Sequence, residues 1–350
     1  MLCLLSPEDR VPKTHPLRRI KRLADEVFDE LSALFDQMYS TTGRPSVPPE
    51  RLLKAMVLMA LYGVRSERLL CEQLDYNLLF RWFLDMDMVE EAFDATAFSH
   101  NRERLMDHEV AARFFSSVVG RAQRAGLMSS EHFSVDGTLI EAWASLKSFR
   151  PKDEDDGDNN GWGDIRGTKR SNDTHQSRTD PEARLARKGN GREAKLSFSA
   201  HALMENRSGL LVDFQLAEAN PRAEPRVALE MLGRSVRGSH RATVGADRGY
   251  DQRGFVAGAR QLNITPHVAQ FGQRGGNRGS AIDRRTVRHR GYAQSLVKRM
   301  RVEEIFGWMK SSARFARSRW RGIARTQLMG HVVAAAYNLL RMGKLLPEAA

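Results

Sequence analysis

The sequence has very little cysteine and no long apolar run. Only Cys3 and Cys71 occur among 350 residues, so neither a disulfide framework nor a paired-cysteine zinc motif can form. No basic segment precedes a long apolar stretch near the start, and the longest apolar run, at Met56 to Leu61 with its flanks, is too short to span a bilayer. We therefore expect a chain of the reducing cytoplasm, without a secretory signal or a membrane partner.

Acidic residues are outnumbered, and the imbalance is local. The chain carries 55 Lys and Arg against 43 Asp and Glu, a formal net charge of +12. Residues 271–325 alone contain 15 basic and three acidic residues. Such a block attracts polyanions, because binding releases phosphate counterions. A membrane surface fits less well, since the block lacks a sustained amphipathic helix. Nucleic acid is the expected partner.

Apolar residues recur at helical spacing through the first third of the chain. The expected helices cover residues 18–38, 49–63, 66–83, 96–105 and 109–125. The two helices that flank residues 62–65 resemble a helix-turn-helix, although an ordinary helical hairpin explains them equally well. We expect an all-helical N-terminal DNA-binding domain over residues 1–128.

The apolar period changes after Gly126, where strands begin to alternate with helices. Strands are expected at 132–140, 194–205, 210–217, 242–246 and 264–268, and helices at 222–236, 251–262, 298–310 and 327–340. This order predicts an α/β domain, a mixed sheet with flanking helices, over residues 129–345. Two stretches poor in large apolar residues are expected to be a disordered insert, 146–192, and a mobile basic loop, 270–294.

The helix expected at 298–310 has two different sides. At about 100° per residue, one stripe holds Arg299, Glu303, Phe306 and Lys310. The opposite side holds Val297, Ile305, Trp308 and Met309. Glu303 should therefore point away from the core and Glu304 should not. Taken alone, a surface helix with charge pairs four residues apart explains this pattern better than a functional site does.

Two earlier aspartates change that balance. Asp136 and Asp247 are each expected at the carboxyl end of a short apolar strand, where α/β sheets place ligand sites. Together with Glu303 they would repel one another unless cations lay between them. Hard oxygen ligands with open coordination suit paired Mg²⁺, which can activate an attacking oxygen and stabilise a departing one. Each aspartate taken singly is also explained as a turn former or a helix cap.

Several short motifs together resemble a known family. Residues 135–138 (VDGT), residues 245–251 (GADRGYD), and Arg299, Glu303 and Lys310 resemble the three blocks of bacterial insertion-sequence DDE transposases of the insertion-sequence four and five superfamily. The third block of that family begins with Tyr, and Leu296 stands at that position. Residues 43–64 resemble the helical N-terminal domain of the family.

The resemblance implies an RNase H-like catalytic domain in which Asp136, Asp247 and Glu303 hold two Mg²⁺ ions, with Mn²⁺ as a substitute. It implies a nucleoid-associated enzyme that cuts double-stranded DNA at terminal inverted repeats and joins the freed 3′-hydroxyl to target DNA. We expect it to act as a homodimer or a larger assembly. The expected DNA contacts are Arg299, Lys310, Arg248, Tyr250, Arg301 and Arg314.

Two other functions remain open at this point. A non-catalytic DNA-binding regulator would use the helix pair at 49–83 and would not need the three acids. A stand-alone metal-dependent nuclease would use the acids to cut DNA without joining it. Inverted repeats flanking the coding region would be expected only for a transposase.

Overall fold

The computed structural model describes residues 6–38, 47–107, 109–152, 170–189, 191–220, 223–236, 240–270 and 279–347. The chain divides into two compact units. The helical unit comprises Met1–Ser129, Ile305–Phe315 and Leu328–Ala350, and the sheet unit comprises Ser130–Glu304 and Ala316–Gln327. Within the ranges described, no helix is long and apolar enough to cross a membrane.

The helical unit contains the expected helices, except that one of them is divided in two and a short helix at its start was not predicted. Its N-terminal helices are α1 (Pro7–Arg10), α2 (Pro16–Met38), α3 (Pro49–Tyr62), α4 (Glu67–Tyr76), α5 (Leu78–Phe83), α6 (Ala95–Asp107) and α7 (Val110–Arg124). Gly63 ends α3 in the left-handed conformation, and the Ser66 hydroxyl caps α4. The single helix expected at 66–83 is wrong, because the Asn77 side chain accepts a hydrogen bond from the Phe80 N–H at 3.2 Å and starts a new helix.

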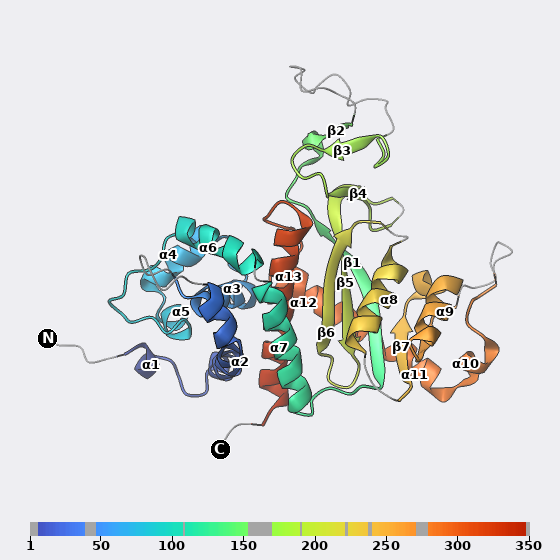
Figure 1. Cartoon of the computed structure of the whole chain (residues 1–350), viewed down its shortest axis with the longest axis horizontal. Coiled ribbons are helices and arrows are strands. Elements are labelled where there is room, and N and C mark those ends of the chain that lie inside the picture. The colour runs from blue at the N-terminus through green and yellow to red at the C-terminus, as the bar shows by residue number, and fades with distance from the viewer. Residues whose placement is uncertain are drawn as a thin grey trace. The chain divides into compact units, whose positions relative to one another are not determined.

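The sheet unit is built on a mixed six-stranded sheet (Figure 1). Its strands are β1 (His132–Glu141), β4 (Arg184–Ala186), β5 (Lys195–Glu205), β6 (Leu211–Glu218), β7 (Ala242–Ala246) and β8 (Ile264–Val268). β1, β5 and β6 form an antiparallel run, and β7 and β8 continue the other side of β1 in parallel. The order β6-β5-β1-β7-β8, with one helix between β6 and β7 and another between β7 and β8, confirms the predicted RNase H-like sheet.

Helices cover both faces of this sheet. α8 (Glu224–Ser235) and α9 (Arg253–Gln261) bury their apolar sides against Phe133, Val135 and Val244. Because side chains alternate along a strand, Ser134 and Asp136 belong to the opposite face. α11 (Arg290–Lys298) packs there, since a methyl group at Gly245 would lie 3.1 Å from the Ser295 carbonyl oxygen and 3.3 Å from the Ser134 hydroxyl.

The expectation of a disordered insert over 146–192 is wrong for its described residues, while 153–169 and residue 190 lie outside them. This region contains the 3-10 turn η1 (Leu146–Ser148), β2 (Phe149–Pro151), β3 (His175–Ser177) and β4. The Phe149 ring is buried and stacks on His175 at 5.4 Å, and β4 pairs with the start of β5. These strands are three residues long, too short for an alternating pattern to reveal them.

The expected mobile loop 270–294 is likewise corrected in part, with 271–278 outside the described residues. α10 (Arg284–Arg288) and α11 occupy most of the remainder. Asp283 starts α10 by accepting a hydrogen bond from the Thr286 N–H at 2.7 Å. The abundance of arginine concealed two short capped helices.

The single helix expected at 298–310 is also wrong. The chain turns at Arg299 and Met300, between α11 and α12 (Arg301–Ser311). The predicted division of this segment into an exposed and a buried side is therefore wrong. Val297 is 69% exposed and Phe306 is only 7% exposed. Glu304 is exposed as well as Glu303. After α12 the chain ends in α13 (Ile323–Leu345).

Candidate active site

Two of the predicted acids are brought together by the pairing of β1 with β7. This parallel pairing joins His132 to Thr243 and Ser134 to Gly245. Continued by two residues at the same offset, it sets Asp136 opposite Asp247. Asp247 directly follows β7, as predicted. Asp136 does not end its strand as predicted, because β1 runs on to Glu141 through its pairing with β5.

A glycine beside each aspartate fixes the orientation of its carboxylate. The Gly137 N–H donates to Asp136 Oδ1 at 2.8 Å, and the Gly249 N–H donates to Asp247 Oδ1 at 2.8 Å. A methyl group at position 249 would lie only 3.0 Å from that same Asp247 oxygen. The glycines of the VDGT and ADRG motifs therefore orient these two carboxylates.

Arg299 lies in the turn between α11 and α12, and Glu303 lies in the first turn of α12. Gly245 has no side chain, and a methyl group there would lie 3.3 Å from Arg299 Cβ. The charges of Arg299 and Glu303 both act on Asp136. The structure thus brings Asp136, Asp247, Arg299 and Glu303 into one electrostatic neighbourhood.

Burial dominates the protonation behaviour of Asp136. It raises the pKa of this carboxyl to about 6, and the negative charges of Asp247 and Glu303 act in the same direction. The Gly137 N–H and the Arg299 guanidinium oppose the shift. A positive charge near these carboxylates would relieve their repulsion.

A further carboxylate, Glu224, was not predicted from the sequence. It begins α8, and burial followed by the charges of Asp247 and Asp136 raises its pKa to about 7. Gly137 leaves room for it, since a methyl group there would lie 3.2 Å from Glu224 Oε1. An acid in the first turn of a helix usually only complements the helix dipole. The available signal was positional: α8 follows β6, and the site lies where strands and helices connect.

A cavity of about 1060 Å³ opens over these acids. Asp136, Asp247 and Glu224 are among the residues that line it. Basic residues of the insert line it as well, namely Lys152, Arg170, Arg184, Arg187 and Lys188. A space lined by both carboxylates and cations suits a phosphate-bearing substrate whose reacting group needs metal ions.

The sequence matches two known family models. Residues 129–339, more than half of the chain, match the family described as Transposase DDE domain. The chain belongs to this transposase family. Residues 5–104 match a second one, described as Transposase domain (DUF772). The DDE match contains Asp136, Asp247 and Glu303, so the three predicted acids all lie in the part of the transposase that defines its family.

The comparison with solved structures found transposases at low similarity. A piggyBac transposase synaptic complex with hairpin DNA superimposes with a TM-score of 0.43 at 10% identity, covering 96% of this chain and 77% of that chain. A pre-cleavage Mos1 transpososome superimposes with a TM-score of 0.21 at 11% identity, covering 89% of this chain and 83% of that chain.

The residues predicted to contact DNA differ in their exposure and in their contacts within the protein. Arg248 is exposed beside Asp247, on the short turn η2 (Arg248–Tyr250). Tyr250 was predicted to contact DNA, but it is only 1% exposed and its ring packs edge-on against Phe255 at 5.2 Å. It therefore belongs to the core. Arg301 donates to the Asn206 carbonyl at 3.2 Å and thereby supports the turn between β5 and β6.

The remaining predicted contacts lie in the helical unit. Lys310 is two turns after Glu303 on α12, and Arg314 follows that helix with a φ of 55°. Leu296, which replaces the tyrosine of the family pattern, is partly buried against the apolar cluster of the sheet unit. Its position is that of a packing residue.

The donor set suits divalent cations of the Mg²⁺ class in part. Asp136, Asp247 and Glu303 offer only hard carboxylate oxygens. Within the described residues, however, no three His, Cys, Asp or Glu side chains converge tightly enough to enclose one metal ion. Mg²⁺ does not require such a cage, because it commonly binds one or two carboxylates and completes its shell with water and phosphate. The open acidic cluster fits that mode of binding.

Proposed function

We propose that this transposase cuts DNA at terminal inverted repeats and joins the freed 3′-hydroxyl to target DNA in a Mg²⁺-dependent reaction. The observation that carries the proposal is the parallel pairing of β1 with β7, which ends two residues before Asp136 and Asp247, together with the charges of Asp247 and Glu303 that act on Asp136. Both reactions displace an oxygen at phosphorus, so positioning and charge can account for most of the catalysis.

In this proposal Asp136, Asp247 and Glu303 would hold two divalent cations, with Mn²⁺ able to replace Mg²⁺. Such ions supply positive charge to the attacking and the departing oxygens. The Gly137 and Gly249 N–H groups hold one oxygen of each aspartate and leave the second oxygen available. Arg299 supplies positive charge beside Asp136 and is suited to hold a phosphate next to the scissile bond.

The parts of the chain have different roles in this proposal. Region 1–128 binds DNA, and region 129–345 carries the reaction. Arg299, Arg248, Lys310 and Arg314 contact phosphates, whereas Tyr250 and Arg301 have structural roles. The cut element ends and the target are double-stranded DNA, and the protein acts on them as a dimer or a larger assembly.

The test compares two neighbouring glutamates. Glu303→Gln should reduce cleavage of DNA carrying the native element ends by about 10³-fold or more, since it removes a charge that the proposal assigns to metal binding. Binding of the uncut end should stay within about threefold. Glu304→Gln is the matched control, because this residue is exposed on the same first turn of α12, and it should be mild in both assays.

Supplying a pre-cut end with a free 3′-hydroxyl separates the alternatives. Joining to target DNA in the presence of Mg²⁺ supports transposition, whereas cleavage without joining would identify a nuclease. A regulator would show neither reaction and would tolerate Glu303→Gln. Greater loss of cleavage in Glu304→Gln than in Glu303→Gln would overturn the assignment of Glu303.

A further inference from the structure

A short loop next to the acidic cavity carries three cations. It connects β4 to β5 over residues 187–189 and 191–194, with residue 190 outside the described residues, and its ends are fixed by the pairing of Ala186 with Lys195. β4 is held a second time, because Asn172 exchanges two hydrogen bonds with the backbone of Leu185, at 2.8 and 3.0 Å. The β4–β5 loop therefore starts and ends on anchored strands.

The loop borders two cavities. Arg187 and Lys188 line the cavity of about 1060 Å³ that contains Asp136 and Asp247. Lys188 also lines a second cavity, of about 780 Å³, together with Arg192. Because Leu139, Ala186 and Lys188 are common to both, the two cavities adjoin along the start of the loop. A DNA strand that lies over the carboxylates can continue past Lys188 into the second cavity.

Other cations of these cavities already have partners. Arg184 forms two hydrogen bonds with the Glu218 carboxylate, at 2.8 and 3.0 Å. Lys195 donates to Glu141 at 3.2 Å, and Lys152 donates to the Asp173 carbonyl at 2.9 Å. These side chains stabilise the protein itself.

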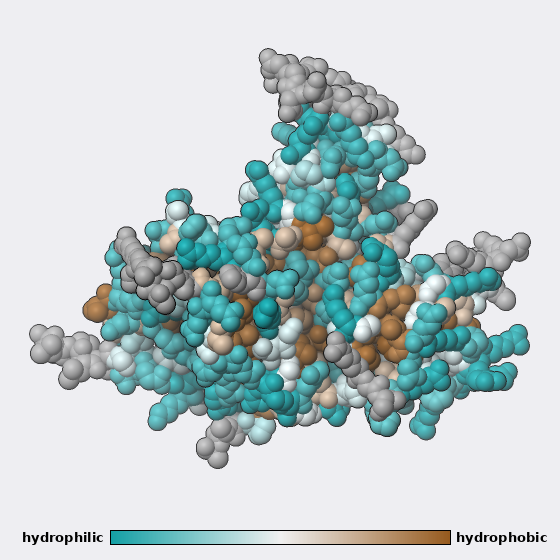
Figure 2. Space-filling model, in the orientation of Figure 1, coloured by the Kyte–Doolittle hydropathy of each residue, from teal (hydrophilic) through white to brown (hydrophobic). Residues whose placement is uncertain are grey.

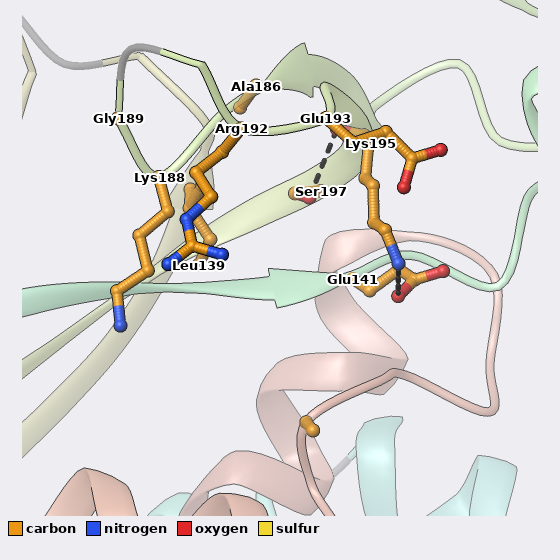
Figure 3. A pocket seen from close by; sticks show the side chains of 10 residues that line it. Leu139, Glu141, Ala186, Lys188, Gly189, Arg192, Glu193, Lys195 and Ser197 are labelled. Carbon is orange, nitrogen blue, oxygen red and sulfur yellow. Dashed lines mark hydrogen bonds and ion pairs between the residues drawn. The ribbon is translucent and has the colours of Figure 1, made fainter.

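The loop cations differ from them. Arg187, Lys188 and Arg192 are exposed, and within the part of the chain that the structure describes their side chains form no ion pair or hydrogen bond. Figure 3 shows Lys188 and Arg192 extending from the loop to the same side, toward β1, while the Glu193 carboxylate points elsewhere. The surface over the neighbouring β2–β4 is mainly hydrophilic on the face seen in Figure 2. Three such cations within six residues repel one another, and this repulsion is relieved by a polyanion.

We propose that the β4–β5 loop is a DNA-phosphate-binding element, in which Arg187, Lys188 and Arg192 hold the strand that continues from the acidic cavity into the second one. This inference rests on the proposed function, which places DNA at the carboxylates. Contacts of this kind set the position of the strand and read no sequence. The loop would thus hold DNA next to the carboxylates. It belongs to the insert and lies outside all of the family motifs.

The test uses the full chain and the salt dependence of DNA binding. The triple variant Arg187→Gln/Lys188→Gln/Arg192→Gln is compared with Arg226→Gln/Arg241→Gln/Arg260→Gln, which makes the same change in net charge. The control residues are exposed and line neither cavity, and Arg226 and Arg260 already pair with Glu230 and Asp283. Thermal unfolding checks that both variants fold.

Affinity for a duplex with the element end is measured by fluorescence anisotropy from about 50 to about 200 mM salt. The loop variant should lower the slope of log affinity against log salt by about 2 to 3, since each lost phosphate contact contributes about 0.7 to 0.9. Binding at about 100 mM salt should weaken roughly 10- to 100-fold. A duplex of unrelated sequence should lose affinity by the same factor, and the control variant should change little.

Equal slopes for the two variants would overturn the inference. So would a loss confined to the element-end sequence, because phosphate contacts cannot produce it. The proposed function is judged separately, from the joining reaction of the unaltered protein with Mg²⁺: failure to join rejects transposition, whereas the difference in slope still reports whether the loop binds DNA.

Discussion

At the scale of single residues, the site contains carboxyl groups whose charged form is disfavoured by burial and by neighbouring carboxylates. Glu224 and Asp136 are both buried enough to raise their pKa values, to about 7 and about 6. Both pKa values are raised above the ordinary values of 4.5 and 3.8, so protonation stabilises the folded state. That stabilisation is fully present below about pH 4 and is lost as the pH rises through 6 to 7.

We therefore expect the metal-free protein to be less stable at pH 8 than at pH 5, and part of this difference to disappear in Glu224→Gln. The contribution of Glu224 is about 1 to 2 kcal/mol, after allowance for solvent screening of a partly exposed carboxyl.

Mg²⁺ should raise the melting temperature more at pH 8 than at pH 5, because it binds the deprotonated carboxylates.

Thermal unfolding with and without Mg²⁺ at the two pH values measures both effects. Glu230→Gln, on the exposed side of the same helix, is the matched control and should leave the pH dependence unchanged. A Mg²⁺ effect that is equal at both pH values, or that is larger at pH 5, would contradict the assignment of these carboxylates to cation binding.

At the scale of elements, the contact between β7 and the end of α11 decides where Arg299 lies. Gly245→Ala would place a methyl group 3.1 Å from the Ser295 carbonyl oxygen and 3.3 Å from Arg299 Cβ. Because the first of these contacts is with backbone, the helix must shift. We expect a loss of about 1 to 3 kcal/mol of stability and a larger relative loss of DNA cleavage, measured at a temperature where the variant is folded.

Gly254→Ala in α9 is the control for this substitution. A methyl group there meets nothing within 4 Å, so stability should be unchanged or slightly higher and cleavage should be normal. Cleavage by Gly245→Ala at the normal rate would mean that the position of α11 does not govern the site.

The elements also show what the sequence could and could not predict. The strand before Asp247 and the order of strands and helices followed from apolar patterning, which is a local property. The extent of β1 was also close to the expected strand at 132–140, but the place of Asp136 within that strand rather than at its carboxyl end did not follow, because it depends on the pairing with β5. The turn at Arg299 and Met300 was missed because apolar spacing continues through it, and Glu224 was missed because its neighbours in space are distant in sequence.

At the scale of the whole molecule, the helical unit is assembled from distant parts of the chain. Segments 305–315 and 328–350 belong to it together with the N-terminal helices. The Phe115 ring stacks on His331 of α13 at 5.9 Å, and Arg19 donates to the Gly343 carbonyl at 3.0 Å. Val332, Val333 and Leu339 of α13 are completely buried. The apolar core of the unit therefore depends on the C-terminal helix.

A fragment comprising residues 1–128 should consequently fail to fold as a stable domain, even though the sequence marks it as one. Without α13 it exposes the apolar surfaces of α2 and α7 that this helix contacts, and removing several fully buried side chains costs about 2 to 5 kcal/mol each. We expect broad, weakly cooperative thermal unfolding by circular dichroism and binding of a hydrophobic dye. A full chain shortened only at its end, to residue 347, should unfold sharply.

Co-expression supplies the complementary arm of this experiment. A second polypeptide spanning residues 301–347 should associate with the 1–128 fragment and restore cooperative unfolding, since it returns α13 to the core. If the 1–128 fragment instead unfolds sharply and binds no dye on its own, α13 is dispensable for this core. In that case the DNA-binding role proposed for 1–128 could be tested on the fragment. If the 1–128 fragment does not fold on its own, its DNA-binding role must be tested in the whole chain.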